Sequence, residues 1–169
     1  MAVPKDIKHH LRQGGWVFVD RPKHPLLVGP LADADKLVKV APPEKLVVFT
    51  AEPGILSQHV SEINDLMWDV MEHTHHELWL QVPGARNVPD AVITAPDLVQ
   101  VHWAQSGTLH EMAYAVSKAL LGVSVPTQKQ AREQLWAQLE NIVSLRPQKE
   151  QTPERRRMLL APDGTVRML

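Results

Sequence analysis

Three side chains that can carry positive charge lie in one short loop between two apolar stretches of the sequence: Arg21, Lys23 and His24. Guanidinium, ammonium and imidazole groups donate hydrogen bonds to phosphate oxygens, and α/β folds bind their ligands at strand ends. Further basic residues precede this loop in the segment 5–12. The loop therefore predicts contacts to the phosphate of a nucleotide or of an RNA backbone. The alternative is an ordinary solvated basic face, because only two Phe and one Tyr are present for base stacking.

Two groups of histidines suggest other chemistry. His73, His75, His76 and Glu77 are residue types that bind zinc, nickel or copper. Adjacent residues at the end of a helix cannot all point at one ion, however, so we interpret them as solvated helix-end side chains and predict no metal site.

His102 and His110 flank a short loop, and Glu111 follows directly. Such residues can provide a general base and the carboxylate that orients it. No serine or threonine is placed by the sequence as a nucleophile, so roles at a strand end and in a helix cap are the alternative.

The composition excludes several classes of protein. The 169 residues fit one domain, 1–169, and the apolar (44%) and charged (22%) fractions are those of a globular protein. The formal net charge of −1 gives no overall basicity, and the absence of cysteine excludes disulfides, thiol catalysis and cysteine-ligated zinc. No window approaches the roughly 20 apolar residues of a membrane span. We expect a cytoplasmic protein, and the oligomeric state stays open.

The apolar pattern predicts a mixed α/β fold of roughly seven strands and five helices. Short apolar runs predict strands at 16–19, 26–28, 46–49, 78–82, 91–93 and 99–103. Helical periodicity predicts helices over 32–40, 56–71, 108–121 and 127–147, the third with a capping box of Thr108 and Glu111 and a terminal Gly122. Residues 148–157 are predicted to be an exposed linker or loop with a solvated arginine run, and 157–169 a strand pair around Pro162-Asp163-Gly164.

Tryptophans fall into two groups. Trp16, Trp79 and Trp103 lie in predicted strands and are expected in the core. Trp68 and Trp136 fall off the main helical stripes, so one of them is a candidate for an exposed partner surface.

Several stretches resemble the YrdC/YciO family over nearly the whole chain. They are the opening segment into Gly14-Gly15 and the strand 16–19, the segment 71–84 with Val88-Pro89, the order of elements from Val99 to Val125, and the closing stretch 159–167. The resemblance implies an open twisted sheet with flanking helices around a concave cavity. It also implies threonylcarbamoyl-AMP synthesis for tRNA modification, with ATP and Mg²⁺ as cofactors; no cofactor follows from the residues alone.

Three site motifs of that family are altered here. A Pro-Thr-Asp-Thr-type loop is replaced by the segment 20–25, and a Lys-x-Arg pair that grips phosphates is reduced to Lys45. A Ser-Thr-Ser-Ala-Asn segment is replaced by Ser124-Val125-Pro126-Thr127-Gln128, which keeps two hydroxyls. The sequence therefore leaves three hypotheses. The first is a divergent domain that binds nucleotide or structured RNA through Arg21, Lys23, His24 and Lys45. The second is a surviving synthase that uses Ser124 and Thr127, and the third is a non-catalytic interaction protein.

Overall fold

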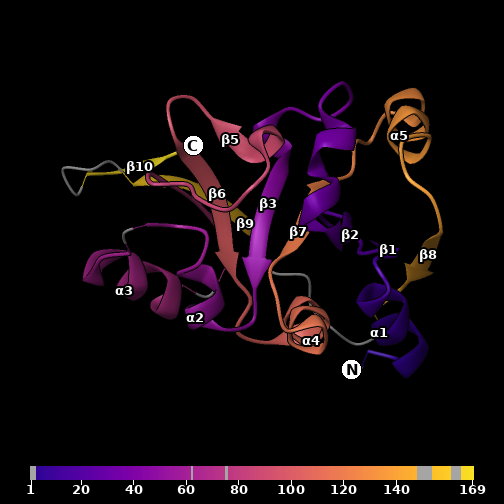
Figure 1. The fold of residues 1–169 in the computed structure, drawn as a ribbon, viewed down its shortest axis with the longest axis horizontal. Helices are drawn as coiled ribbons and strands as arrows, with labels where there is room; N and C mark the ends of the chain where they lie inside the picture. Colours follow the sequence, from indigo (N-terminus) through magenta and orange to yellow (C-terminus); the bar gives the residue numbers. More distant parts are fainter. Residues whose placement is uncertain (1–2, 62, 75, 148–153, 161–164) are drawn as a thin grey trace.

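The computed structural model describes residues 3–61, 63–74, 76–147, 154–160 and 165–169. It contains one mixed sheet of ten strands in the order β10-β9-β4-β6-β3-β7-β2-β1-β8, with β5 paired to β6 (Figure 1). The strands are β1 (Trp16–Val19), β2 (Leu26–Pro30), β3 (Leu46–Thr50), β4 (Glu77–Val82), β5 (Ile93–Thr94), β6 (Leu98–Trp103), β7 (Leu120–Ser124), β8 (Ile142–Leu145), β9 (Arg155–Leu160) and β10 (Val166–Met168). The predicted fold class, an α/β fold with a twisted sheet and flanking helices, is confirmed.

Five α-helices and three short 3-10 helices cover the sheet within the described part of the chain. They are α1 (Lys5–Arg12), α2 (Pro53–Leu56), α3 (Asp65–His73), α4 (Gly107–Val116), α5 (Lys129–Trp136), η1 (Leu31–Leu37), η2 (Pro43–Lys45) and η3 (Asp90–Val92). Side chains of α1 and α4 pack into one buried cluster, and those of α2, α3 and α5 into a second cluster. In Figure 1, α4 and α5 lie at opposite ends of β7. None of the described helices is long and apolar enough to cross a membrane.

Two predicted helices are each divided in the structure. The predicted helix 56–71 is α2 followed by α3, and between them Val60 forms a β-bridge with Ala85. Asn64 starts α3 because its side-chain oxygen accepts a hydrogen bond from the Met67 amide at 2.9 Å. The predicted helix 127–147 is α5 followed by the edge strand β8, which pairs in parallel with β1.

The predicted helix over 108–121 is wrong at its C-terminal end. It stops at Val116, and Ser117 adopts a left-handed conformation with φ 59°. Gly122 is therefore not a helix terminator: it lies inside β7, which pairs with both β2 and β3. The capping box is also wrong, because Ser106 is the N-cap residue and Glu111 accepts a hydrogen bond from the Val3 amide.

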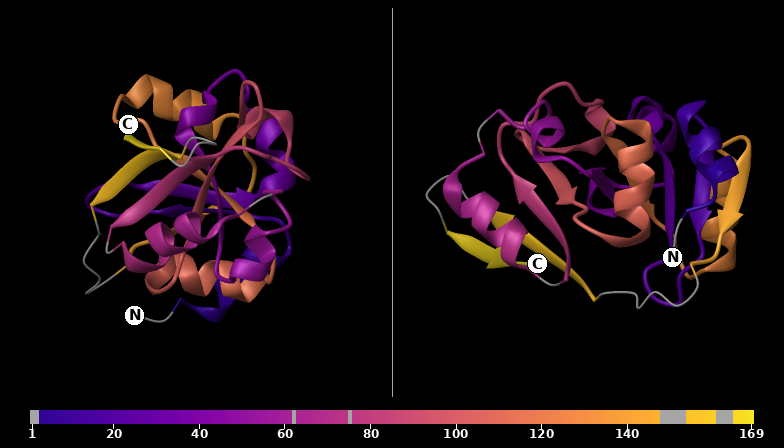
Figure 2. Two further views of the ribbon diagram at one scale, coloured as in Figure 1. Left: turned by 90° about the vertical axis from the view of Figure 1, so that its left-hand side faces the viewer. Right: turned by 90° about the horizontal axis from the view of Figure 1, so that it is seen from below.

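Several shorter elements also differ from those predicted from the sequence. The predicted helix 32–40 is the 3-10 helix η1, which ends at Leu37, and the predicted strand 91–93 is the 3-10 helix η3 followed by the short β5. The predicted loop 148–157 is corrected at its C-terminal end, because β9 begins at Arg155; residues 148–153 lie outside the described residues. The predicted strand pair at the C-terminus is confirmed as β9 with β10 (Figure 2), although its turn lies outside the described residues.

A buried ion-pair cluster joins β4, β9 and the loop after β1. Glu77 and Arg155 start β4 and β9 and lie opposite each other in the parallel register. Arg21 Nη1 lies 2.8 Å from Glu77 Oε1, and Arg155 Nε lies 2.9 Å from Glu77 Oε2. All three side chains are less than a tenth exposed. We call this set the Glu77 cluster.

The Glu77 cluster also shows how strongly the sheet curves. Arg155 Nη1 donates to Ser124 Oγ at 3.3 Å, although three strands separate β9 from β7 in the sheet. On a flat sheet with about 4.8 Å between strands, these two strands would lie about 19 Å apart. The sheet must therefore curl so that its two halves approach each other. The Arg155 guanidinium also stacks over Trp79, 3.9 Å from the ring centroid.

Replacing the shared carboxylate is expected to destabilise the fold strongly. Glu77→Gln leaves two buried guanidinium groups without a counter-charge, and breaking a buried ion pair in this way typically costs about 3–5 kcal/mol. Urea unfolding measures the change. The matched control is Glu154→Gln, because Glu154 pairs with Arg156 at the surface at 3.6 Å and should change the free energy of unfolding by less than about 0.5 kcal/mol. A loss below about 1 kcal/mol in Glu77→Gln would contradict the role given to the cluster.

Stability should also depend on pH through Glu77. Burial alone would raise the pKa of this carboxyl, but the guanidinium of Arg21, with Arg155, lowers it from 4.5 to about 2. Since the pKa is lower in the folded state, the stabilisation is complete above the unfolded value and is lost as the pH falls from about 4.5 through 2. Unfolding at a series of pH values should show a loss of about 3 kcal/mol across this window. The same series on Glu77→Gln should lack that part of the pH dependence.

Candidate functional site

A groove of about 730 Å³ brings together four of the six residues that the sequence singled out. His24, Lys45, Ser124 and Thr127 all line it. The remaining walls are largely apolar and are formed by Pro25, Val40, Ala41, Pro42, Val125, Pro126, Gln128, Ala131 and Leu135. A mostly apolar groove of this size with a few convergent polar groups is typical of a small-molecule site.

The sheet register explains why residues far apart in sequence meet in this groove. β7 is antiparallel to both β2 and β3, so its C-terminal end lies beside the N-terminal ends of the other two strands. Ser124 consequently lies opposite Leu26, next to His24, and Val123 opposite Leu46, next to Lys45. The Val125 amide continues the contact by donating to the Pro25 carbonyl at 3.2 Å. The sequence then leads directly into α5.

α5 borders the groove from its N-cap residue, Gln128, to Leu135. Gln128 is its N-cap residue, and the side chain makes no capping hydrogen bond. The first-turn amides of a helix have no partner within the helix, and the helix dipole adds partial positive charge there. Lys45 is exposed at the groove and Ser124 and Thr127 add two hydroxyl groups. The groove can therefore bind an anion through several donors.

Arg21 and Lys23 lie outside the groove. Arg21 is buried in the Glu77 cluster and donates from Nη2 to the His24 carbonyl at 2.7 Å, so it holds the loop in position. Lys23 is exposed in the same loop. His24 has a positive φ of 51°, and burial together with the nearby Arg155 lowers its pKa, so a neutral ring is favoured. Contact of Arg21 and Lys23 with a ligand stays a prediction.

Arg155 is a site residue that sequence reasoning missed. The arginine run was predicted to be solvated, but Arg155 is buried beside Ser124 and Arg157 donates to Gln100 Oε1 at 2.9 Å. Arg156 alone of the three is exposed. This alternation is the period-two pattern of a strand. Three identical residues carry no such pattern in the sequence, so no local signal there distinguishes Arg155 from its two neighbours.

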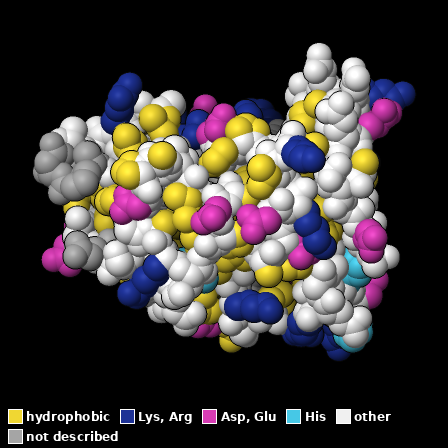
Figure 3. Space-filling view, turned by 45° about the horizontal axis from the view of Figure 1, so that its top comes forward, with side chains coloured by type: hydrophobic (Ala, Val, Ile, Leu, Met, Phe, Trp, Pro, Cys, Tyr) yellow, Lys and Arg dark blue, Asp and Glu magenta, His cyan; other side chains and the backbone are white. Residues whose placement is uncertain are grey.

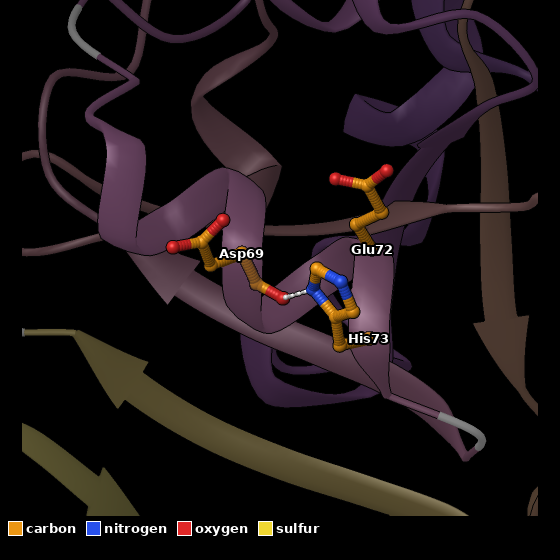
Figure 4. Close-up of side chains that lie close together, drawn as sticks. All are labelled: Asp69, Glu72 and His73. Atoms are coloured by element: carbon orange, nitrogen blue, oxygen red, sulfur yellow. Dashed lines mark hydrogen bonds between the residues drawn. The ribbon is translucent and has the colours of Figure 1, made fainter.

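The histidine-rich segment does not form an enclosed metal site in the described residues. Asp69, Glu72 and His73 lie within 4.8 Å of one another on α3, and all three are exposed (Figure 4). His73 Nδ1 donates to the Asp69 carbonyl at 3.0 Å, which leaves one ring nitrogen for other contacts. Glu77 belongs to the buried cluster, and His75 lies outside the described residues.

The predicted pairing of a histidine base with Glu111 is not formed. His102 Nδ1 bonds to the Leu78 carbonyl and His110 Nδ1 to the Ala104 carbonyl, both at 2.8 Å. Glu111 accepts instead from the Val3 amide.

The tryptophan predictions are confirmed for the core and wrong for the surface. Trp16 and Trp79 are fully buried, and Trp103 packs against the core. Trp68 and Trp136 are half-buried, and each forms an edge-to-face ring contact, Trp68 with Trp103 and Trp136 with Phe18. Neither ring is therefore an exposed partner surface.

Comparison with known proteins gives a match in structure only. No family model and no curated protein sequence matches the chain. E. coli YciO superimposes with a TM-score of 0.73 at 14% identity, covering 99% of this chain and 90% of YciO. P. abyssi Sua5 in complex with L-threonine gives a TM-score of 0.67 at 14% identity, covering 90% of this chain and 49% of Sua5. Full-length HypF in its phosphate- and nucleotide-bound form gives 0.71 at 9% identity, covering 98% of this chain and 28% of HypF.

These similarities extend along the whole sheet with its helices, and the sequence resemblance pointed to the same group. The identities are too low to carry over an activity. The chain has the YrdC/YciO-like fold.

Proposed function

We propose that the groove binds a nucleotide, with its phosphates at the α5 end and its base against the apolar wall. The observation that carries this proposal is that Lys45, two hydroxyl groups and the uncapped N-terminus of α5 all border one otherwise largely apolar groove. Helix N-termini and ammonium groups are the usual partners of phosphate oxygens. The nucleotide-bound state of HypF, a structural neighbour, supports the same ligand class.

The groove provides phosphate donors but no carboxylate. None of its described lining residues is Asp or Glu. Mg²⁺ prefers carboxylate oxygens and phosphates as ligands, so it would have to reach this groove already bound to the phosphates of the nucleotide. Such an ion would neutralise phosphate charge there. The chain itself contributes Lys45, the hydroxyls of Ser124 and Thr127, and the α5 amides.

A mononucleotide fits the groove better than structured RNA does. Binding of an RNA backbone relies on several cationic side chains placed along a surface, and base stacking on aromatic rings. Among the described residues that line the groove, one is a lysine and none is Phe, Tyr or Trp. On the face in Figure 3, Lys and Arg side chains are dispersed among hydrophobic and acidic ones and do not gather in one patch.

The proposal is that the protein binds a nucleotide but does not catalyse the synthase reaction of the family. Where the family carries a Lys-x-Arg pair, the segment 40–45 offers Lys45 and no arginine. Val40, Ala41 and Pro42 of this segment line the groove as apolar residues. The loop that contacts substrate in the family carries Arg21, which is engaged with Glu77 here. The proposed nucleotide site therefore has fewer phosphate contacts than the family pattern implies.

Titration calorimetry with AMP, ADP and ATP tests the proposal. Affinity should rise with the number of phosphates, and Lys45→Ala should weaken ATP binding about tenfold, since a hydrogen bond to a charged group contributes about 1.5–3 kcal/mol. The control is Lys39→Ala, because Lys39 is an exposed lysine nearby that does not line the groove. Lys39→Ala should bind ATP like the unmodified protein.

The same assay with a short RNA duplex separates the alternatives. Salt-sensitive RNA binding without nucleotide binding would replace the proposal with an RNA-binding role. No binding of any of these ligands, or equal affinity in Lys45→Ala, would refute it.

A further inference from the structure

A second cavity, of about 510 Å³, lies between the N-terminal end of α4 and the start of β4. The described residues that line it are all different from those that line the groove. Arg21 and Glu77 line the cavity. The arginines of the Glu77 cluster also donate hydrogen bonds to His24 and Ser124, which line the groove. The cluster therefore lies between the two spaces. This cavity is not used by the proposed nucleotide site.

His102 offers an unused hydrogen-bond acceptor to the cavity. The residue lies on β6, is only 9% exposed and lines the cavity. Its Nδ1 lies 2.8 Å from the Leu78 carbonyl, and a carbonyl oxygen can only accept, so Nδ1 carries the proton. Nε2 of the neutral ring is then an acceptor, and it makes no hydrogen bond within the described part of the chain. Burial lowers the pKa of His102, which favours this neutral ring.

The surroundings of this acceptor favour negative charge. The cavity is lined by the start of α4, at Ser106 and Gly107, and the Ser106 side chain makes no capping hydrogen bond. The α4 dipole therefore places partial positive charge at the cavity. Arg21 lines it as well, and the cluster of two arginines with one carboxylate has a net charge of +1. The other lining carboxylate, Glu72, is exposed on α3.

We propose that this cavity binds a small oxyanion that keeps a proton near neutral pH, of the hydrogenphosphate type, with its O–H donating to Nε2 of His102. Its charged oxygens face the N-terminus of α4 and Arg21. The proposal does not depend on nucleotide binding in the groove.

The proton of the anion is the specific part of the proposal. A fully deprotonated anion such as sulfate would place an acceptor against the Nε2 acceptor, and two facing acceptors repel each other and stay unpaired in a buried site. Sites that pair a buried polar group with one hydrogen on the ligand reject the analogue that lacks it. Inorganic phosphate and sulfate have similar shapes and differ in this hydrogen at pH 7. They are therefore the matched pair of probes.

The experiment is a titration of the full chain with inorganic phosphate and with sulfate at pH 7 and equal ionic strength, followed by the ¹⁵N NMR shift of His102 Nε2. Phosphate should bind at least tenfold more tightly than sulfate and shift the Nε2 resonance. Equal binding of the two anions, or an unchanged resonance at saturating phosphate, would overturn the proposal. This comparison needs no variant and so does not depend on whether a variant folds.

A variant pair assigns the binding to His102. In His102→Asn, the side-chain amide can still donate to the Leu78 carbonyl, as Nδ1 does, but the Nε2 acceptor is removed. Phosphate affinity should fall at least tenfold. The control is His110→Asn, because His110 makes the same 2.8 Å bond to a backbone carbonyl but does not line the cavity. It should bind phosphate within twofold of the unmodified protein; unchanged affinity in His102→Asn would contradict the proposal.

Two further experiments distinguish this site from the groove and free phosphate from phosphate monoesters. In Lys45→Ala, phosphate binding should persist while ATP binding is weakened. Loss of phosphate binding in this variant would place the anion in the groove and refute the cavity site.

Methyl phosphate at pH 6, where about half of it keeps a proton, tests whether the cavity accepts a phosphate ester. Binding of methyl phosphate with the same His102 dependence extends the site to phosphate monoesters, and its exclusion limits the site to free phosphate.

Discussion

The carboxylate of Glu77, buried between two guanidinium groups, is the constraint on which the arrangement of this molecule depends. A buried charge is tolerated only when it is paired and its hydrogen bonds are made, so Glu77 requires Arg21 and Arg155 within contact distance. Those residues come from the loop after β1 and from β9, which lie far apart in the sheet order. Pairing them fixes the curl of the sheet, places the His24 carbonyl, and holds Ser124 at the end of β7.

The cluster also sets the electrostatics on both of its sides. Two positive charges meet one negative charge, so one positive charge is left uncompensated inside the protein. Coulomb interactions are stronger at the low effective dielectric of an interior than in water, and this excess charge lies next to both the groove and the cavity. The N-terminus of a helix also borders each space: α5 borders the groove and α4 borders the cavity. The two proposed anion sites therefore share one physical basis, although different side chains would contact the anion in each.

Sequence reasoning succeeded where local pattern and final structure agree. The apolar runs of β1, β3 and β6 are buried strands, and the C-terminal strand pair is β9 with β10. It failed where pairing between distant segments decides the outcome. Leu120 continues the helical stripe of α4, yet it belongs to β7 because β2 and β3 provide partners on both sides. The groove residues could be listed from the sequence, but Arg155 could not, because its burial depends on a carboxylate 78 positions away.

The differences from the YrdC/YciO pattern are linked by the same constraint. Arg21 stands in the loop that contacts substrate in that family, and a buried arginine there would be uncompensated without Glu77. Glu77 in turn interacts with a second arginine, Arg155, whose guanidinium occupies the space over Trp79 and beside Ser124. None of the three is tolerable alone at these positions, since each would leave an unpaired buried charge. Arg21 of the loop therefore serves the structure in this chain, and the proposed ligand sites are the groove and the cavity on either side of the Glu77 cluster.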